Sequence, residues 1–148
     1  MKLRDVLETK ANILHSLDAE TDLTAAARLL AEQRIGAVVV LDADGGLQGI
    51  LSERDISRAF GNDGAAAVTQ TVSSVMTSSV ITCHPDHDVD ELFRSMVDNN
   101  IRHLPIVDDS GPIGMLSIRD LARALVQNYE SDIQDLKNLL VSLDVNAA

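Results

Sequence analysis

The segment Ser52-Glu53-Arg54-Asp55-Ile56-Ser57-Arg58-Ala59 recurs, 65 residues further along the chain, as Ser117-Ile118-Arg119-Asp120-Leu121-Ala122-Arg123-Ala124. Five of the eight paired positions are identical. An apolar triplet that begins with glycine precedes each copy, Gly49-Ile50-Leu51 in the first and Gly114-Met115-Leu116 in the second. The chain therefore contains an internal repeat, and this repeat determines the fold class before any single element is assigned.

The repeat extends upstream, where residues 34–42 match residues 100–108 and Asp22 matches Asp88, both at an offset of 66. Each copy reads as strand, helix, strand, turn, strand and helix. We expect helices near 22–34 and 88–99, with the two aspartates as N-caps. The expected strands are 12–17, 36–41 and 47–51 in the first copy and 79–83, 104–107 and 113–117 in the second. Residues 1–62 form the first repeat, 63–74 a linker, 75–127 the second repeat and 128–148 a C-terminal extension.

Composition excludes several classes of partner. The 148 residues include 12 basic and 23 acidic side chains, a net charge of −11, which excludes nucleic acid and a polybasic membrane anchor. The longest apolar run, 35–41, is far shorter than the roughly 20 residues that span a bilayer. The opening residues Met1–Asp5 carry no apolar stretch and are not expected to be a signal peptide. The single cysteine, Cys83, excludes an internal disulfide and fits a reducing cytoplasm.

The duplicated Ser-x-Arg-Asp carries the chemistry. It stands where a strand enters a helix, and a helix N-terminus offers unpaired N–H groups that suit an anion. The serine and arginine suit a phosphate, while the aspartate accepts hydrogen bonds from the cis-hydroxyls of a ribose. The alternative is that serine is only an N-cap and aspartate only satisfies the first helical turn. Two aligned copies in equivalent places favour the ligand-binding interpretation.

Other polar residues allow two readings each. Arg58 and Arg123 lie one turn beyond the motif and fit either a phosphate or, as we favour, solvent-exposed pairing on an acidic surface. The pair Arg102-His103 has Gly36-Ala37 as its counterpart, which indicates two unequal sites or simply an edge arginine and a half-buried histidine. Cys83, close to two histidines, fits a small strand residue better than a metal ligand or nucleophile, and we expect no metal and no catalytic residue.

Taken together, these residues resemble a tandem pair of CBS (cystathionine β-synthase-type) domains. Two Gly-φ-φ-Ser-x-x-Asp motifs (φ is apolar), residues 75–82 and residues 101–108 carry the resemblance, which covers about residues 3–127. It implies an α/β (α+β) fold of two β-α-β-β-α repeats, packed about a pseudo-twofold axis, with a C-terminal helical extension. It also implies an adenosine derivative in the clefts between repeats: AMP first, otherwise ATP, ADP, NAD(H) or S-adenosylmethionine. The chain looks like the stand-alone bacterial members.

The resemblance also implies which residues bind. It places ribose recognition on Asp55 and Asp120, phosphate or ribose contacts on Ser52 and Ser117, and phosphate contacts on Arg54 and Arg119. It builds one adenine pocket from Val80, Ile81, Thr82, Ile101, Arg102, His103 and Leu104, and its counterpart from Ile13–His15 with Ile35, Gly36 and Ala37. The first copy lacks the Met76-Thr77 and Arg102-His103 pairs of the second. We therefore expect unequal clefts and a smaller role for Asp55 than for Asp120.

The end of the chain carries an apolar stripe with alternating spacings of four and three, as at the a and d positions of a coiled coil. Its members are Ala122, Val126, Tyr129, Ile133, Leu136, Leu140 and Leu143. This helix either packs on its own domain or forms a seam with another subunit. We favour the subunit contact, since CBS pairs generally form dimeric discs, and we expect a homodimer.

Three functions are consistent with these patterns. The favoured one is a cytoplasmic, adenine-nucleotide-binding regulatory module that acts on an unidentified protein. The second is a scaffold whose clefts are empty, and the third, least favoured, is a small enzyme acting on nucleotides. No Gly-x-Ser-x-Gly elbow, P-loop or His-Glu-x-x-His motif supports the third.

Overall fold

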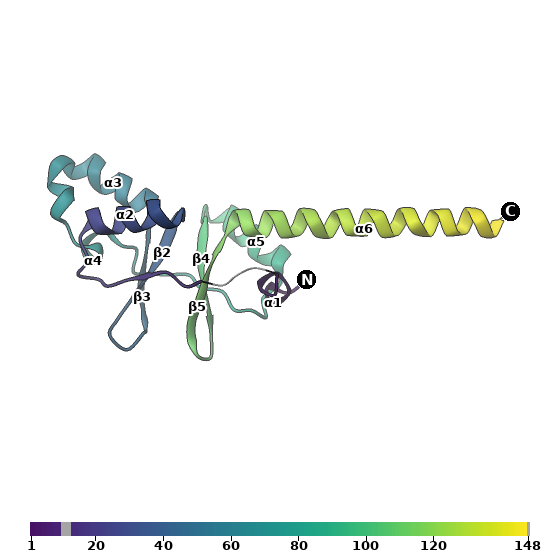
Figure 1. Ribbon diagram of the computed structural model, residues 1–148, viewed down its shortest axis with the longest axis horizontal. Helices are drawn as coiled ribbons and strands as arrows, with labels where there is room; N and C mark the ends of the chain where they lie inside the picture. The colour runs from purple at the N-terminus through teal and green to yellow at the C-terminus, as the bar shows by residue number, and fades with distance from the viewer. Residues whose placement is uncertain (10–12, 148) are drawn as a thin grey trace.

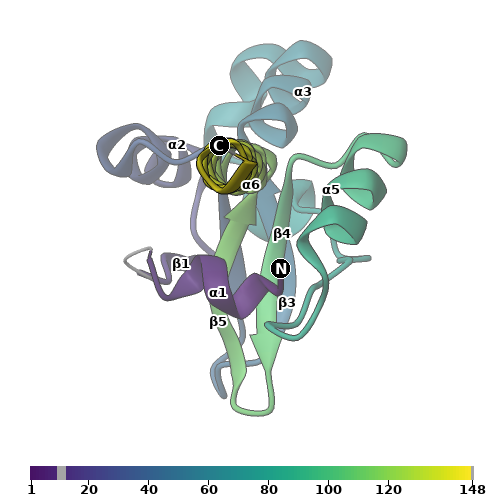
Figure 2. The ribbon, with the colours of Figure 1, turned by 90° about the vertical axis from the view of Figure 1, so that its right-hand side faces the viewer.

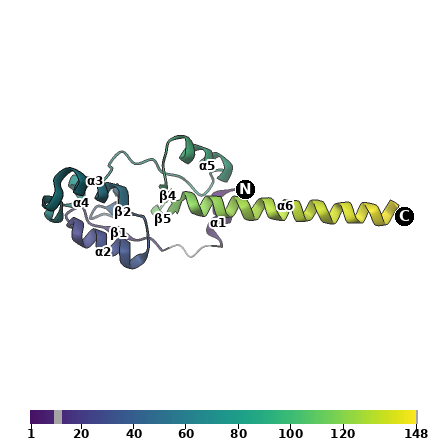
Figure 3. The same cartoon turned by 90° about the horizontal axis from the view of Figure 1, so that it is seen from above.

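In the computed structural model, residues 1–9 and 13–147 are described, the last four of these by backbone alone. The two repeats lie side by side, and one long helix projects from the second (Figures 1 and 3). The first half holds β1 (Ser16–Leu17), α2 (Leu23–Gln33), β2 (Ala37–Leu41), β3 (Leu47–Ser52) and α3 (Glu53–Asp63). The second holds α5 (Val89–Asp98), β4 (His103–Asp108), β5 (Gly111–Ser117) and α6 (Ile118–Ala147). The α/β fold of two repeats with a C-terminal helix is confirmed.

The helices begin where the sequence places their caps. The Asp22 carboxylate accepts from the Ala25 amide at 2.8 Å, and the Asp88 carboxylate accepts from the Glu91 amide at 3.2 Å. Each helix is followed by a left-handed residue at the matching position, Arg34 with φ of 55° and Asn100 with φ of 53°. The two halves therefore repeat backbone conformation as well as sequence.

Each half is built on a β-hairpin. In the first, β1 pairs parallel to β2 and β2 pairs antiparallel to β3; in the second, β4 pairs antiparallel to β5. The expected strand over 79–83 is reduced to a parallel bridge between Cys83 and Ile106, because residues 78–79 and 81–82 are exposed and lie outside the sheet. The expected strand over 12–17 is limited to Ser16–Leu17, and Asn12 lies outside the described residues.

The two halves exchange their short helices. Helix α1 (Leu3–Leu7) packs Leu3 and Val6 into the core of the second half, where the Leu3 amide donates to the His87 carbonyl at 2.9 Å (Figure 2). Conversely, α4 (Val72–Val75) packs Val72 into the core of the first half, and the Val72 amide donates to the Thr21 carbonyl at 2.8 Å. The segment expected to be a linker also contains a short 3₁₀ helix, η1 (Gly64–Thr69), whose Ala67 is buried in the same core.

Helix α6 is continuous over 30 residues, about 45 Å at 1.5 Å per residue. Its first turns are anchored in the second core by Leu121 and Leu125. Beyond Tyr129 it leaves the domain (Figure 1). Among the described residues, no helix combines the length and the apolarity that crossing a bilayer requires.

Candidate functional site

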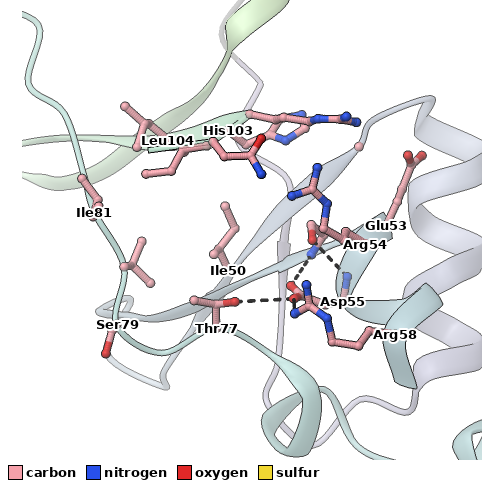
Figure 4. Close-up of a pocket in the computed structure, with 16 residues that line it drawn as sticks. Ile50, Glu53, Arg54, Asp55, Arg58, Thr77, Ser79, Ile81, His103 and Leu104 are labelled. Carbon is pink, nitrogen blue, oxygen red and sulfur yellow. Dashed lines mark hydrogen bonds and ion pairs between the residues drawn. The ribbon is translucent and has the colours of Figure 1, made fainter. Parts of the chain in front are cut away.

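A cleft of about 330 Å³ lies where the two repeats face each other (Figure 4). Four stretches of chain form it: the passage from α2 into β2, the passage from β3 into α3, the segment after α4, and the passage from α5 into β4. Its lining comprises Gly36, Ile50, Ser52, Glu53, Arg54, Asp55, Arg58, Thr77, Ser79, Val80, Ile81, Asn100, Ile101, Arg102, His103 and Leu104. One repeat therefore contributes the Ser-x-Arg-Asp motif and the other contributes most of the apolar wall.

Asp55 is the buried polar side chain of the described residues, with 7% exposure. Its Oδ2 accepts from the Ser52 amide at 2.9 Å, while its own amide donates to the Ser52 hydroxyl at 3.2 Å. This reciprocal capping box starts α3 and fixes the carboxylate at the cleft. The capping interpretation from the sequence is thus correct for Asp55, and it does not compete with ligand binding because Oδ1 is directed elsewhere.

Among the described residues, the second carboxylate oxygen of Asp55 has only long contacts. Oδ1 lies 3.5 Å from the Thr77 hydroxyl and 3.8 Å from Nη1 of Arg58 (Figure 4). Both distances exceed the usual range for a strong hydrogen bond, 2.5–3.0 Å for O–H···O and about 2.7–2.9 Å for a charged N–H···O. An oxygen held in this way can accept from incoming hydroxyl groups without the loss of a strong internal bond.

The segment that carries Thr77 is tied directly to the motif strand. The Thr77 amide donates to the Ile50 carbonyl and the Ile50 amide donates to the Thr77 carbonyl, both at 3.0 Å. Gly49 permits this approach, because a Cβ there would lie 2.8 Å from both Sδ of Met76 and the Thr77 carbonyl oxygen. The glycine of the Gly-φ-φ-Ser motif therefore seats the opposite wall of the cleft against β3.

Gly36, like Gly49, leaves space for a residue of the other repeat, in this case His103. A Cβ at Gly36 would lie 3.0 Å from Cε1 and 3.1 Å from Nε2 of His103, so the missing side chain leaves room for the imidazole of the other repeat. From the sequence, we interpreted the replacement of Arg102-His103 by Gly36-Ala37 in the first repeat as a sign of unequal clefts. The structure shows in addition that the two residues fit against each other within one cleft.

Charge in the cleft differs from charge on the whole chain. Arg54, Arg58 and Arg102 line it together with two carboxylates, Glu53 and Asp55, although the chain carries a net charge of −11. The amino end of α3, an 11-residue helix, also faces this space. Such a site suits a ligand that carries both an anionic group, for the arginines, and hydrogen-bond donors, for the carboxylates.

The structure brings together ten of the sixteen residues expected to bind ligand: Ser52, Arg54, Asp55, Val80, Ile81, Ile101, Arg102, His103, Leu104 and Gly36. It does not place Thr82, Ile35 or Ala37 on this cleft; Thr82 is exposed and Ala37 is buried in β2. Ser117, Arg119 and Asp120 lie at the equivalent start of α6, where the Ser117 amide donates to Asp120 at 3.2 Å. They do not line this cleft.

Sequence reasoning missed five lining residues, Ile50, Glu53, Thr77, Ser79 and Asn100, and it favoured solvent for Arg58, which lines the cleft. The smaller role expected for Asp55 rested on the assumption that its cleft lacks the Met76-Thr77 and Arg102-His103 pairs. This assumption is wrong, because Thr77, Arg102 and His103 all line the cleft that contains Asp55. The family-like segments of the second repeat complete the site of the first.

Comparison with known proteins agrees with this architecture. Residues 3–62 and 72–127 match the CBS domain family. The chain belongs to this family. It is 33% identical over 142 residues to the mitochondrial CBS domain-containing protein CBSX3 of Arabidopsis thaliana, covering 90% of this chain and 69% of the relative.

Solved CBS structures show the same fold. The CBS-domain protein ATU1752 of Agrobacterium tumefaciens superposes with a TM-score of 0.81 at 35% identity, over 84% of this chain and 98% of that one. The CBS domain pair of protein MJ0100, solved with 5-methylthioadenosine and S-adenosyl-L-methionine, gives a TM-score of 0.76 at 26% identity, over 86% and 98%. This chain therefore has the fold of a CBS domain pair.

Proposed function

We propose that the cleft around Asp55 binds an adenosine nucleotide, with AMP as the first candidate, and that the protein is a ligand-responsive regulator rather than an enzyme. The observation that carries this proposal is the buried Asp55 carboxylate, which has one oxygen fixed by the Ser52 amide and the other in long contacts only. A ribose presents two neighbouring hydroxyl donors, and this oxygen suits them. The ligand pair of the MJ0100 structure shares adenosine, which supports the same class of ligand here.

The rest of the cleft suits the other parts of such a ligand. Ile50, Ile81 and Leu104 offer apolar surface for the adenine ring. Arg54 and Arg58 stand on either side of Asp55 in sequence and reach the phosphate, while Arg102 adds charge from the opposite repeat. We assign Ser52, Arg54, Asp55, Val80, Ile81, Ile101, Arg102, His103 and Leu104 to this site, with Gly36 as a spacer. We assign Ser117, Arg119 and Asp120 to a second ligand site, at the equivalent position of the other repeat.

The test is a ligand panel read by thermal unfolding and by native mass spectrometry of the purified protein. The panel contains AMP, ADP, ATP, NAD, NADH, S-adenosylmethionine and adenosine. A ligand at 100 times its dissociation constant adds about 2.7 kcal/mol of stability, which for a chain of this size raises Tm by about 5–11 °C. We expect AMP to bind more tightly than adenosine, because only AMP meets the arginines. Ligand-free protein whose melting temperature none of these compounds changes would refute the proposal and favour a scaffold.

The proposal also covers the oligomeric state, the partner and the cellular compartment of the protein. We propose a homodimer, because twofold dimers are the commonest soluble homo-oligomers, and a further protein that reads the ligand state. Buried, unpaired Cys83 fits a reducing compartment such as the cytoplasm.

A further inference from the structure

The outer part of α6 presents an apolar stripe that its own domain does not cover. Val126, Tyr129, Ile133, Leu136, Leu140 and Leu143 are each 54–57% exposed, in contrast to the buried Leu121 and Leu125 at the base of the same helix. The hydroxyl of Tyr129 donates to Asp90 of α5 at 3.2 Å, which marks where contact with the domain ends. The interpretation that this helix packs on its own domain is therefore wrong beyond Tyr129 (Figure 1).

We infer that the stripe is a seam for a second copy of this chain, which packs its own α6 alongside to form a two-stranded coiled coil. The stripe runs from 126 to 143, and its spacings of three and four continue without interruption. Heptad a positions are then Val126, Ile133 and Leu140, and d positions are Tyr129, Leu136 and Leu143. Two β-branched residues at a, with leucine at two of three d positions, are the composition typical of two-stranded coils.

Lys137, the only basic residue after Arg123, is evidence that the partner of α6 is a second α6 helix. Lys137 is exposed at heptad position e, and the residues three and four positions away on its own helix are Ile133, Gln134, Leu140 and Val141, none of them acidic. A lysine that flanks a seam without an acidic neighbour on its own helix is suited to an acidic residue on the partner helix.

A second copy supplies that residue in either orientation. In a parallel pair, position e faces g of the other helix, and Lys137 meets Asp132 of the partner subunit. In an antiparallel pair, e faces e, and Lys137 meets Glu130 of the partner subunit. Twofold symmetry forms the contact twice, so the two Lys137 side chains of a dimer pair with two acidic residues beside the seam.

The base of α6 lowers the entropic cost of association. Helix formation has a costly first step, because the first turn of an isolated helix must form without packing. Here Leu121 and Leu125 hold the first turns in the second core, so the exposed half extends a helix that is already nucleated. The partner therefore meets a preformed surface and needs to order little. This inference rests on α6 alone and is independent of the ligand.

The experiment is sedimentation velocity on the full chain and two matched double variants. Ile133→Asp with Leu136→Asp places two carboxylates in the seam. Ser131→Asp with Asn138→Asp adds the same charge at position f, on the opposite face. We expect a wild-type dimer, an unchanged dimer for the position-f variant, and a dissociation constant raised at least about a hundredfold for the seam variant, since each tenfold corresponds to about 1.4 kcal/mol. Because these side chains are exposed, both variants should fold as the wild type does, with the same far-UV circular dichroism spectrum. A monomeric or trimeric wild type, or a seam variant as tight as its control, overturns the inference.

Charge reversal then tests Lys137. We expect Lys137→Glu to weaken the dimer by about tenfold, as for loss of one flanking ion pair on each side of the seam. Restoration by Asp132→Lys supports the parallel pair, and restoration by Glu130→Lys supports the antiparallel pair. An unchanged Lys137→Glu dimer, or restoration by neither second substitution, shows that Lys137 does not face the partner helix.

Discussion

Replacement of Asp55 by asparagine separates the two duties of this carboxylate. Asparagine keeps a side-chain oxygen for the Ser52 amide, 2.9 Å away, so the cap of α3 survives. It loses the negative charge and puts an NH₂ group where Oδ1 now lies, and an NH₂ group cannot accept from a ribose hydroxyl. A hydrogen bond to a charged group contributes about 1.5–3 kcal/mol, so the dissociation constant for AMP should rise by about 10- to 150-fold. Titration calorimetry with AMP at neutral pH measures this change directly.

The other repeat provides the matched control. Asp120 closes the same capping box, with the Ser117 amide donating to it at 3.2 Å, but it does not line this cleft. Asp120→Asn should change stability about as much as Asp55→Asn does, and should leave AMP binding in the Asp55 cleft unchanged. A second comparison uses 2′-deoxy-AMP, which the wild type should bind less tightly than AMP, whereas Asp55→Asn should discriminate little between them. Wild-type affinity in a folded Asp55→Asn variant refutes the assignment, and a larger loss in Asp120→Asn places the ligand in the other cleft.

Three further predictions concern the cleft, the buried cysteine and the exchanged helix α1. Gly36→Ala should weaken AMP binding several-fold in calorimetry, because its Cβ would lie 3.0 Å from His103; Gly61→Ala, with no heavy atom within 4 Å of its Cβ, is the control, and equal affinities would contradict the contact. Burial raises the pKa of the Cys83 thiol to about 12, so a disulfide reagent at pH 8 should label it only after unfolding, and the stability that its neutral form contributes should fall as pH rises from about 9 towards 12. Leu3→Ala should cost about 2–5 kcal/mol in urea denaturation, since Leu3 is fully buried, and an unchanged midpoint would show that α1 is not part of the second core.

Local signals predicted much of the fold because they act over a few residues. The Asp22 and Asp88 caps each satisfy an amide three residues away, so the start of α2 and of α5 is written in adjacent positions. The hairpin strands follow from apolar runs on either side of an acidic, glycine-containing turn. Because the sequence is repeated, each element assigned in one half also predicted the equivalent element in the other half.

The exchange of short helices could not be predicted in the same way. Leu3 and Val72 are apolar residues in short amphipathic segments, and nothing within their own segments says which core will bury them. That choice depends on long-range hydrogen bonds such as Leu3 to His87. The same limit applies to the site. The motif identified Asp55 from one repeat, but only packing between repeats showed that Thr77 and His103 complete its cleft.

A hydrogen bond joins the cleft to the projecting helix, and it leads to a last prediction. Arg102 lines the cleft, and its carbonyl accepts from the amide of Ile118, the first residue of α6, at 2.8 Å. A nucleotide phosphate that draws Arg102 inward therefore acts on the first turn of the helix whose far end forms the proposed seam. Thermodynamic linkage requires that any such effect be reciprocal, with couplings of about fivefold or more being typical. We expect the dimer dissociation constant to shift when saturating AMP is present, and the AMP affinity of the Ile133→Asp, Leu136→Asp variant to shift by the same factor. If AMP leaves the dimer constant unchanged while binding normally, nucleotide and seam are independent features of the chain, and the hydrogen bond between Arg102 and Ile118 serves the fold alone.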